Sequence, residues 1–187
     1  MTLPTLTILG PIWGASELCV ALVMRSRSDA ASKDRGSFFL IWAVCLLSIG
    51  IAIIAAYKLP ALALPSSKLV HVAGFFFFML GLFLRCYSIV YLGRFFTPNV
   101  AIAKDHRLID SGPYRFVRHP TYTGLLMIAL GLGVSFGNLA SLLIIVVPIL
   151  ASLLWRIQIE EQALAEAFGE QYRSYMQRTK RLFPLIY

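Results

Sequence analysis

The sequence predicts an all-α integral membrane protein in which five helices span the membrane. Of the 187 residues, 58% are hydrophobic and only 14% are charged, whereas soluble domains average about 45–50% apolar and about 25% charged residues. The apolar residues form blocks near the roughly 20 residues that a helix needs to cross the hydrocarbon core. In addition, the basic residues are concentrated in every second connection between these blocks.

The predicted spans are residues 3–24, 38–57, 69–92, 121–136 and 139–155. The second is the clearest because it carries no formal charge, whereas the third contains Arg85. Residues 121–155 have no charged residue and are too long for one span. Gly137-Asn138, a dipeptide that favours turns, therefore divides them, and the fourth and fifth helices form a tight helical hairpin.

Fourteen of the 17 basic residues lie after the first, third and fifth spans. They are Arg25, Arg27, Lys33, Arg35, Arg94, Lys104, Arg107, Arg115, Arg118, Arg156, Arg173, Arg178, Lys180 and Arg181. Only Lys58 and Lys68 lie on the opposite side. The positive-inside rule then predicts an N-terminus outside and a C-terminus in the cytoplasm. Topology and attraction to anionic lipid explain the net charge of +8, so no nucleic-acid partner is needed.

The chain is expected to form a single membrane domain, residues 1–187, with two cytoplasmic segments, 93–120 and 155–187. Both segments flank the predicted hairpin and so emerge at one membrane face, where any active site should lie. The three cysteines lie inside apolar runs without metal-ligand spacing, so no metal site is expected.

The first cytoplasmic segment cannot form a continuous helix, because it and the start of the next span contain Pro98, Gly112, Pro113, Pro120 and Gly124. Such a loop exposes backbone groups that can wrap a polar small molecule. His106, Tyr114, Arg118, His119 and Tyr122 are the candidate site residues there. Each of them alone could equally be an interfacial anchor, but the whole constellation favours a binding loop.

The second cytoplasmic segment begins as a helix that continues the fifth span. Arg156 and Glu160 are four residues apart and share a helix face, and Glu161 lies about 100° away. An exposed ion pair is the alternative interpretation. However, Arg156 follows 35 uncharged residues, which places a cation at the hydrocarbon boundary, where it can meet an anionic substrate arriving from lipid.

Among the residues of the predicted spans, Arg85 has the highest expected free energy of membrane insertion, because a charged side chain at the centre of a span costs at least ~2.5 kcal/mol. It could pair with a buried acceptor, for which Glu17 in the first span is the candidate, or it could line a substrate cavity. We favour the cavity, since ionisable residues within the membrane are usually functional.

The two cytoplasmic segments together resemble the isoprenylcysteine carboxyl methyltransferase family, in a compact form typical of prokaryotes, which implies a location in the cell inner membrane. The similar blocks are LGRFFTPNV, HRLIDSGPYRFVRHPTYTG and RIQIEEQALAEAFGEQYRSYMQRTKRLFPLIY, which cover most of residues 92–187. The first two spans carry no matching motif. The resemblance implies a membrane-embedded enzyme that transfers a methyl group from S-adenosylmethionine to a carboxylate on a lipidated cysteine.

The resemblance also implies roles for individual residues. The cofactor-binding residues would be His106, Arg107, Leu108, Ile109, Tyr114, His119, Pro120, Thr121, Tyr122 and Glu160. Arg156, Arg85 and Glu161 would bind the substrate, and the two arginines would also be catalytic. The substrate is expected to be a lipidic carboxylate that enters from the membrane, and the protein is expected to act as a monomer.

Three alternatives to this function remain open from the sequence. A membrane sterol reductase that binds NADPH has a similar C-terminal half. Its signature reads RHxNY, however, and here Pro120 and Thr121 occupy the third and fourth positions of that signature. A phospholipid N-methyltransferase needs an amine acceptor, for which Arg156 is badly suited. A structural protein or small transporter leaves the polar cytoplasmic residues unexplained, and no internal repeat suggests a transporter.

Overall fold

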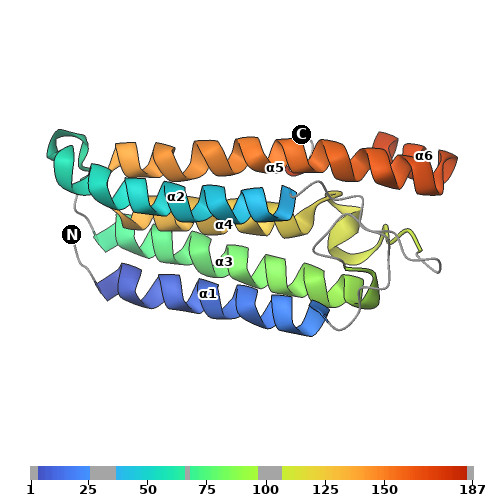
Figure 1. The fold of residues 1–187 in the computed structure, drawn as a ribbon, viewed down its shortest axis with the longest axis horizontal. Coiled ribbons are helices and arrows are strands. Elements are labelled where there is room, and N and C mark those ends of the chain that lie inside the picture. The colour runs from blue at the N-terminus through green and yellow to red at the C-terminus, as the bar shows by residue number, and fades with distance from the viewer. Residues whose placement is uncertain (1–3, 26–36, 66–67, 97–106, 185–187) are drawn as a thin grey trace.

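The computed structural model describes residues 4–25, 37–65, 68–96 and 107–184 and shows five long helices side by side, with a short sixth helix at one end (Figure 1). The helices are α1 (Pro4–Arg25), α2 (Ser37–Lys58), α3 (Lys68–Leu92), α4 (Pro120–Ser135), α5 (Leu139–Phe168) and α6 (Glu170–Arg178). Short 3-10 turns cover Pro60–Leu62, Gly93–Phe95 and Gly112–Arg115. The long helices coincide with the predicted spans to within a few residues, and α5 continues beyond residue 155 to Phe168, as predicted for the start of the second cytoplasmic segment.

The protein is an integral membrane protein with an all-α fold. Among the helices that the structure describes, three are long and apolar enough to cross a membrane: Phe39–Lys58, Lys68–Phe95 and Leu139–Phe168. Two further apolar stretches with described side chains are shorter, namely Ile8–Val20 within the 22-residue α1 and Pro120–Ser135. With 16 residues, α4 is about 24 Å long, less than the roughly 30 Å of the hydrocarbon core.

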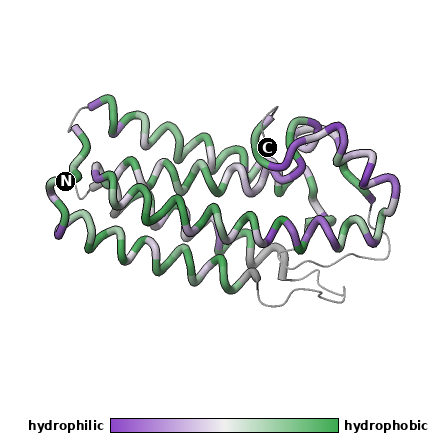
Figure 2. The backbone as a smooth tube through the Cα atoms, turned by 90° about the horizontal axis from the view of Figure 1, so that it is seen from above, coloured by the Kyte–Doolittle hydropathy of each residue, from purple (hydrophilic) through white to green (hydrophobic). Residues whose placement is uncertain are grey.

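The outer surface of the bundle is apolar. Large side chains such as Leu46, Leu47, Phe39 and Leu69 are 65–78% exposed, which in water would create extended apolar patches. Figure 2 shows hydrophobic residues along the helices, whereas hydrophilic ones gather at the end of the bundle that holds α6. This distribution suits helices surrounded by lipid, with a polar region at one end.

Helices α3 and α4 approach each other closely at a pair of glycines. A Cβ atom on Gly81 would lie 2.6 Å from the carbonyl oxygen of Gly124, and a Cβ on Gly124 would lie 2.7 Å from the carbonyl oxygen of Gly81. Neither position has room for a methyl group, because the obstructing atoms belong to the backbone. Small residues at such crossings let membrane helices pack backbone to backbone.

Gly124→Ala is therefore expected to force α3 and α4 apart and to lower the free energy of unfolding by about 1–3 kcal/mol, the usual cost of overpacking. Gly50→Ala on α2 is the matched control, because nothing lies within 4 Å of a Cβ at that position. Thermal unfolding of both variants in detergent measures the difference. Equal melting temperatures for the two variants would contradict the close packing of α3 on α4.

The turn between α4 and α5 lies where the sequence predicts it. The side chain of Asn138 caps α5 by accepting a hydrogen bond from the backbone N–H of Ser141 (3.2 Å). Its amide donates to the carbonyl of Leu59 (2.8 Å), and the backbone N–H of Leu64 donates to the carbonyl of Gly137 (2.8 Å). The hairpin tip is thus attached to the connection that follows α2.

At the opposite end, the chain folds back along the start of α4. Helix α5 ends at Phe168, and α6 leads into a segment that runs beside residues 117–119. The backbone N–H of Arg118 donates to the carbonyl of Lys180 (2.8 Å), and that of His119 donates to the carbonyl of Arg181 (3.0 Å). The two cytoplasmic segments predicted from the sequence are therefore in direct contact.

Candidate functional site

The loop before α4 is held in place by two buried tyrosines. The hydroxyl of Tyr114 donates to the carbonyl of Ser88 on α3 (3.2 Å), and the hydroxyl of Tyr175 on α6 donates to the carbonyl of Tyr114 (2.5 Å). Burial raises the pKa of both hydroxyls above the usual tyrosine value, so both remain protonated donors at neutral pH. Tyr114, predicted to bind the cofactor, thus uses its hydroxyl to join the loop to α3.

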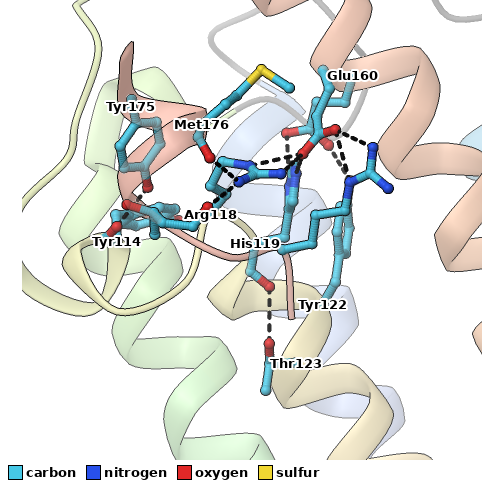
Figure 3. Close-up of polar contacts among 11 residues, drawn as sticks. Tyr114, Arg118, His119, Tyr122, Thr123, Glu160, Tyr175 and Met176 are labelled. Carbon is cyan, nitrogen blue, oxygen red and sulfur yellow. Dashed lines mark hydrogen bonds and ion pairs between the residues drawn. The ribbon is translucent and has the colours of Figure 1, made fainter. Parts of the chain in front are cut away.

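His119 and Tyr122 form a stacked pair at the start of α4. His119 occupies the N-cap position, and Pro120 follows as the first helical residue, a position that suits proline because no intrahelical hydrogen bond is lost. The rings of His119 and Tyr122 lie 5.5 Å apart with an interplanar angle of 19°. One helical turn therefore presents two aromatic rings and their polar atoms to α5 (Figure 3).

The polar face of α5 meets this pair. The hydroxyl of Tyr122 donates to Oε2 of Glu160 (2.6 Å), and Nε of Arg156 donates to the Tyr122 hydroxyl (3.3 Å). Arg156 is 3% exposed, whereas the Glu160 side chain is 29% exposed. The Tyr122 hydroxyl thus joins a buried cation and a more accessible carboxylate, which are one turn apart on α5.

Glu161 points to a different set of partners. Its Oε1 accepts from Nε of Arg118 (2.9 Å), and its Oε2 accepts from Nε of Arg181 (2.9 Å). A second guanidinium nitrogen of each arginine lies 2.8 Å from the same oxygen. His119 Nε2 also lies 3.3 Å from Oε1. The carboxylate is therefore enclosed by two guanidinium groups and an imidazole.

Arg85 lies in a buried ion pair that joins α3 to α1. Its Nε and one terminal nitrogen are 2.5 Å and 2.8 Å from the two carboxylate oxygens of Glu17, and its other terminal nitrogen donates to the carbonyl of Thr121 (3.3 Å). The indole of Trp13 also donates to Glu17 (3.3 Å). The sequence left two interpretations of Arg85, a pair with a buried acceptor or a substrate cavity. The structure shows the pair, with Glu17 as the acceptor. A catalytic role of Arg85 stays a prediction.

The structure brings together only some of the predicted site residues. His119, Tyr122, Arg156 and Glu160 meet in one cluster. Pro120 and Thr121 are buried in the first turn of α4, and the Thr121 carbonyl faces Arg85 rather than the cluster. Of the remaining predictions, His106 lies outside the described residues, Arg107 is exposed, and Leu108 and Ile109 are half-buried.

The sequence indicated Arg118 as a candidate residue of the binding loop but gave it no partner, and it did not place Arg181 in the site. The two arginines bind Glu161 across 43 and 20 residues, respectively. Arg118 directly precedes His119, and this position placed it in the candidate loop. No local pattern could have indicated Arg181, because its contact depends on the return of the chain after α6.

An apolar groove of about 460 Å³ lies on another flank of α4, beside the C-terminal segment. Its lining is almost wholly apolar and consists of Phe83, Leu84, Tyr87, Gly112, Pro113, Phe116, Val117, Pro120, Thr123, Leu182 and Pro184. Tyr122, Arg156 and Glu160 do not line it. The groove therefore suits a lipid chain better than a polar cofactor.

Comparison with known proteins identifies a family model that covers just over half of the chain. Residues 72–166 match the isoprenylcysteine carboxyl methyltransferase (ICMT) family. The matched range includes Arg85, His119, Tyr122, Arg156 and Glu160.

Individual relatives agree with this match. The protein-S-isoprenylcysteine O-methyltransferase of Schizosaccharomyces pombe is 37% identical over 112 residues, which are 59% of this chain and 48% of that protein. A probable protein-S-isoprenylcysteine O-methyltransferase of Oryza sativa subsp. indica is 29% identical over 180 residues, 94% of this chain and 92% of that protein. The chain thus spans about half the length of the yeast relative.

The fold is also similar to a solved structure. A eukaryotic intramembrane Ras methyltransferase, ICMT, superimposes with a TM-score of 0.64 at 27% identity, over 92% of this chain and 62% of that chain. The similarity therefore extends to the first two helices, in which the sequence shows no motif.

Proposed function

The chain belongs to the isoprenylcysteine carboxyl methyltransferase family, and from this premise we propose that it methylates the carboxylate of a lipidic, isoprenylcysteine-like acceptor with S-adenosylmethionine as the methyl donor. The observation that carries the proposal is the cluster in which the Tyr122 hydroxyl connects Arg156 to Glu160. Arg156 offers a cation for an acidic acceptor, and Glu160 offers an anion for a cationic cofactor. The two opposite charges stand one helical turn apart at the polar end of the bundle.

The residues present fit S-adenosylmethionine. The partly exposed carboxylate of Glu160 can bind an ammonium group or ribose hydroxyls, and the stacked rings of His119 and Tyr122 offer an aromatic surface for an adenine or a cationic sulfur. When bound, this cofactor supplies a methyl group on a positively charged sulfonium. Tyr122 would hold the Glu160 carboxylate in one orientation through their 2.6 Å hydrogen bond.

Arg156 is proposed to bind and orient the acceptor carboxylate. A guanidinium group can form two parallel hydrogen bonds to a carboxylate and so fixes its direction as well as its position. A carboxylate is already ionised at neutral pH, so this role needs no general base. The buried setting of Arg156 would exclude water from the acceptor carboxylate, which would favour its reaction with a cationic methyl donor.

The acceptor is proposed to be an acid with a lipid chain. A primary amine would have to lose a proton first and would be repelled by Arg156. The apolar groove beside α4 offers a surface for the chain of an acceptor that arrives from the membrane.

We also propose that α1, with 22 residues, and the shorter α4, with 16 residues, complete five membrane spans. The basic residues of α6 and its flanks then support a cytoplasmic position for the cluster, with the N-terminus outside. The polar end of the bundle that Figure 2 shows would be the cytoplasmic end.

Calorimetric titration of the purified protein in detergent tests the proposed function. We expect S-adenosylhomocysteine to bind and NADPH not to bind. Binding of NADPH without any binding of S-adenosylhomocysteine would overturn the proposal and favour a reductase.

Glu160→Gln is expected to weaken binding of S-adenosylhomocysteine by about tenfold or more, because a buried or half-buried hydrogen bond to a charged group contributes about 1.5–3 kcal/mol. Glu166→Gln on the exposed part of α5 is the matched control and should leave the affinity unchanged. Calorimetric dissociation constants measure both. If Glu160→Gln binds as the unaltered protein does, the cofactor lies elsewhere.

A further inference from the structure

Two adjacent glutamates on α5 face different environments. Glu160 is partly exposed and contacts Tyr122, whereas the Glu161 side chain is 5% exposed and contacts residues from two other parts of the chain, the start of α4 and the segment after α6. The sequence assigns Glu161 to substrate binding. Its contacts in the structure indicate a different role.

The acceptor capacity of Glu161 is used by the protein itself. A carboxylate offers about four lone-pair sites. Arg118 and Arg181 each place two nitrogens within 2.9 Å of one oxygen, and His119 Nε2 lies 3.3 Å from Oε1. These contacts leave no position for a substrate group on this carboxylate.

The partners of Glu161 hold the two cytoplasmic segments together. The guanidinium of Arg118 also donates to the carbonyls of Met176 (3.1 Å) and Thr179. The backbone N–H groups of Arg118 and His119 donate to the carbonyls of Lys180 and Arg181. The Thr123 hydroxyl donates to the carbonyl of Leu182 (2.8 Å). The C-terminal segment is therefore attached along the start of α4, and Glu161 lies at the centre of this junction.

The same junction fixes His119. The ring has one nitrogen against Glu161 and the other 4.0 Å from Oε1 of Glu160, and its face is stacked on Tyr122 (Figure 3). A contact between Glu161 and His119 Nε2 therefore determines how the imidazole is turned relative to Tyr122 and Glu160, the residues proposed to meet the cofactor.

We propose that Glu161 is a positioning residue: its carboxylate joins Arg118 to Arg181 and turns the His119 ring, and it thereby shapes the cofactor site without touching either reactant. The effect on catalysis rests on the proposed function, whereas the junction itself does not. Loss of Glu161 should loosen the C-terminal segment and misplace His119, so that cofactor affinity falls more than turnover.

Site-resolved hydrogen exchange tests the junction without cofactor or activity. In Glu161→Gln, the amide protons of Arg118 and His119 should exchange at least about tenfold faster, because a hydrogen-bonded buried charge has been removed. Glu166→Gln is the matched control and should show unaltered exchange. Unchanged protection of both amides in Glu161→Gln would overturn the positioning role.

Steady-state kinetics then separates positioning from substrate contact. We expect Glu161→Gln to raise the KM for S-adenosylmethionine by about tenfold, with kcat reduced less than threefold. A rise confined to the KM of the lipidic acceptor would show instead that Glu161 binds the substrate. Faster exchange in a protein that transfers no methyl group at all would retain the junction and refute only the proposed function.

Arg181→Gln provides a milder variant in case Glu161→Gln does not fold. It removes one guanidinium and leaves Arg118 on Oε1, so the KM for S-adenosylmethionine should rise by a smaller factor. Arg181→Lys keeps the charge and should restore most of the affinity. Equal KM values for Arg181→Gln and the unaltered protein would contradict the proposal.

Discussion

Arg156→Ala is expected to lower kcat/KM for methyl transfer to the lipidic acceptor by at least about 100-fold, while the affinity for S-adenosylhomocysteine changes less than threefold. The buried guanidinium is the group proposed to orient the acceptor carboxylate, and alignment of two reactants accounts for several kcal/mol of a barrier. Labelled-methyl transfer and calorimetry measure the two quantities on the same preparation.

Two further variants sharpen this prediction. Arg156→Lys keeps the charge but loses the planar pair of donors, so it should recover only part of the activity. Arg173→Ala on α6, where the side chain is 67% exposed, is the control for loss of a cation and should be as active as the unaltered protein. A parallel fall in cofactor affinity and activity in Arg156→Ala would place Arg156 in the cofactor site instead.

Arg85→Leu should lower the free energy of unfolding by about 3–5 kcal/mol, because it leaves the carboxylate of Glu17 buried without its partner. The double variant Arg85→Leu/Glu17→Leu removes both charges and should regain much of the lost stability, since apolar residues often replace a buried ion pair at little cost. Thermal unfolding in detergent compares the three proteins.

The activity of folded Arg85→Leu decides between the two interpretations of this arginine. If the residue joins α1 to α3, the folded fraction keeps a kcat within about threefold of the unaltered protein, an effect below 1 kcal/mol. A normal melting temperature with loss of turnover would instead support the catalytic role that the sequence favours.

The helices could be predicted because the information for them is local. A run of apolar residues forms a helix wherever the membrane or the bundle core surrounds it. The dipeptide Gly137-Asn138 forms the turn between α4 and α5, and the side chain of Asn138 caps α5. The continuation of α5 beyond the membrane was predicted as well, but its end at Phe168 was harder to predict, because hydropathy alone does not show how far a helix continues into the polar region.

The site could be predicted only in part, for the same reason. Arg156 and Glu160 share a face of α5 by helical periodicity alone. Glu17 could be named as a partner of Arg85 because it is the one acid in the first span, but the rotation of α1 and α3 that joins them is a result of packing. The contact of Glu161 with Arg181 needs the chain to fold back after α6, and no local pattern encodes that return.

Transfer of a labelled methyl group to a matched pair of acceptors tests the proposed function most directly. The purified protein is incubated with methyl-labelled S-adenosylmethionine and two isoprenylated thiols of equal chain length, one ending in a carboxylic acid and the other in a primary amine. Recovery of a base-labile methyl ester from the acid alone is the result we predict. No ester from the acid, together with label on the amine, would contradict a carboxyl methyltransferase in which Arg156 binds the acceptor.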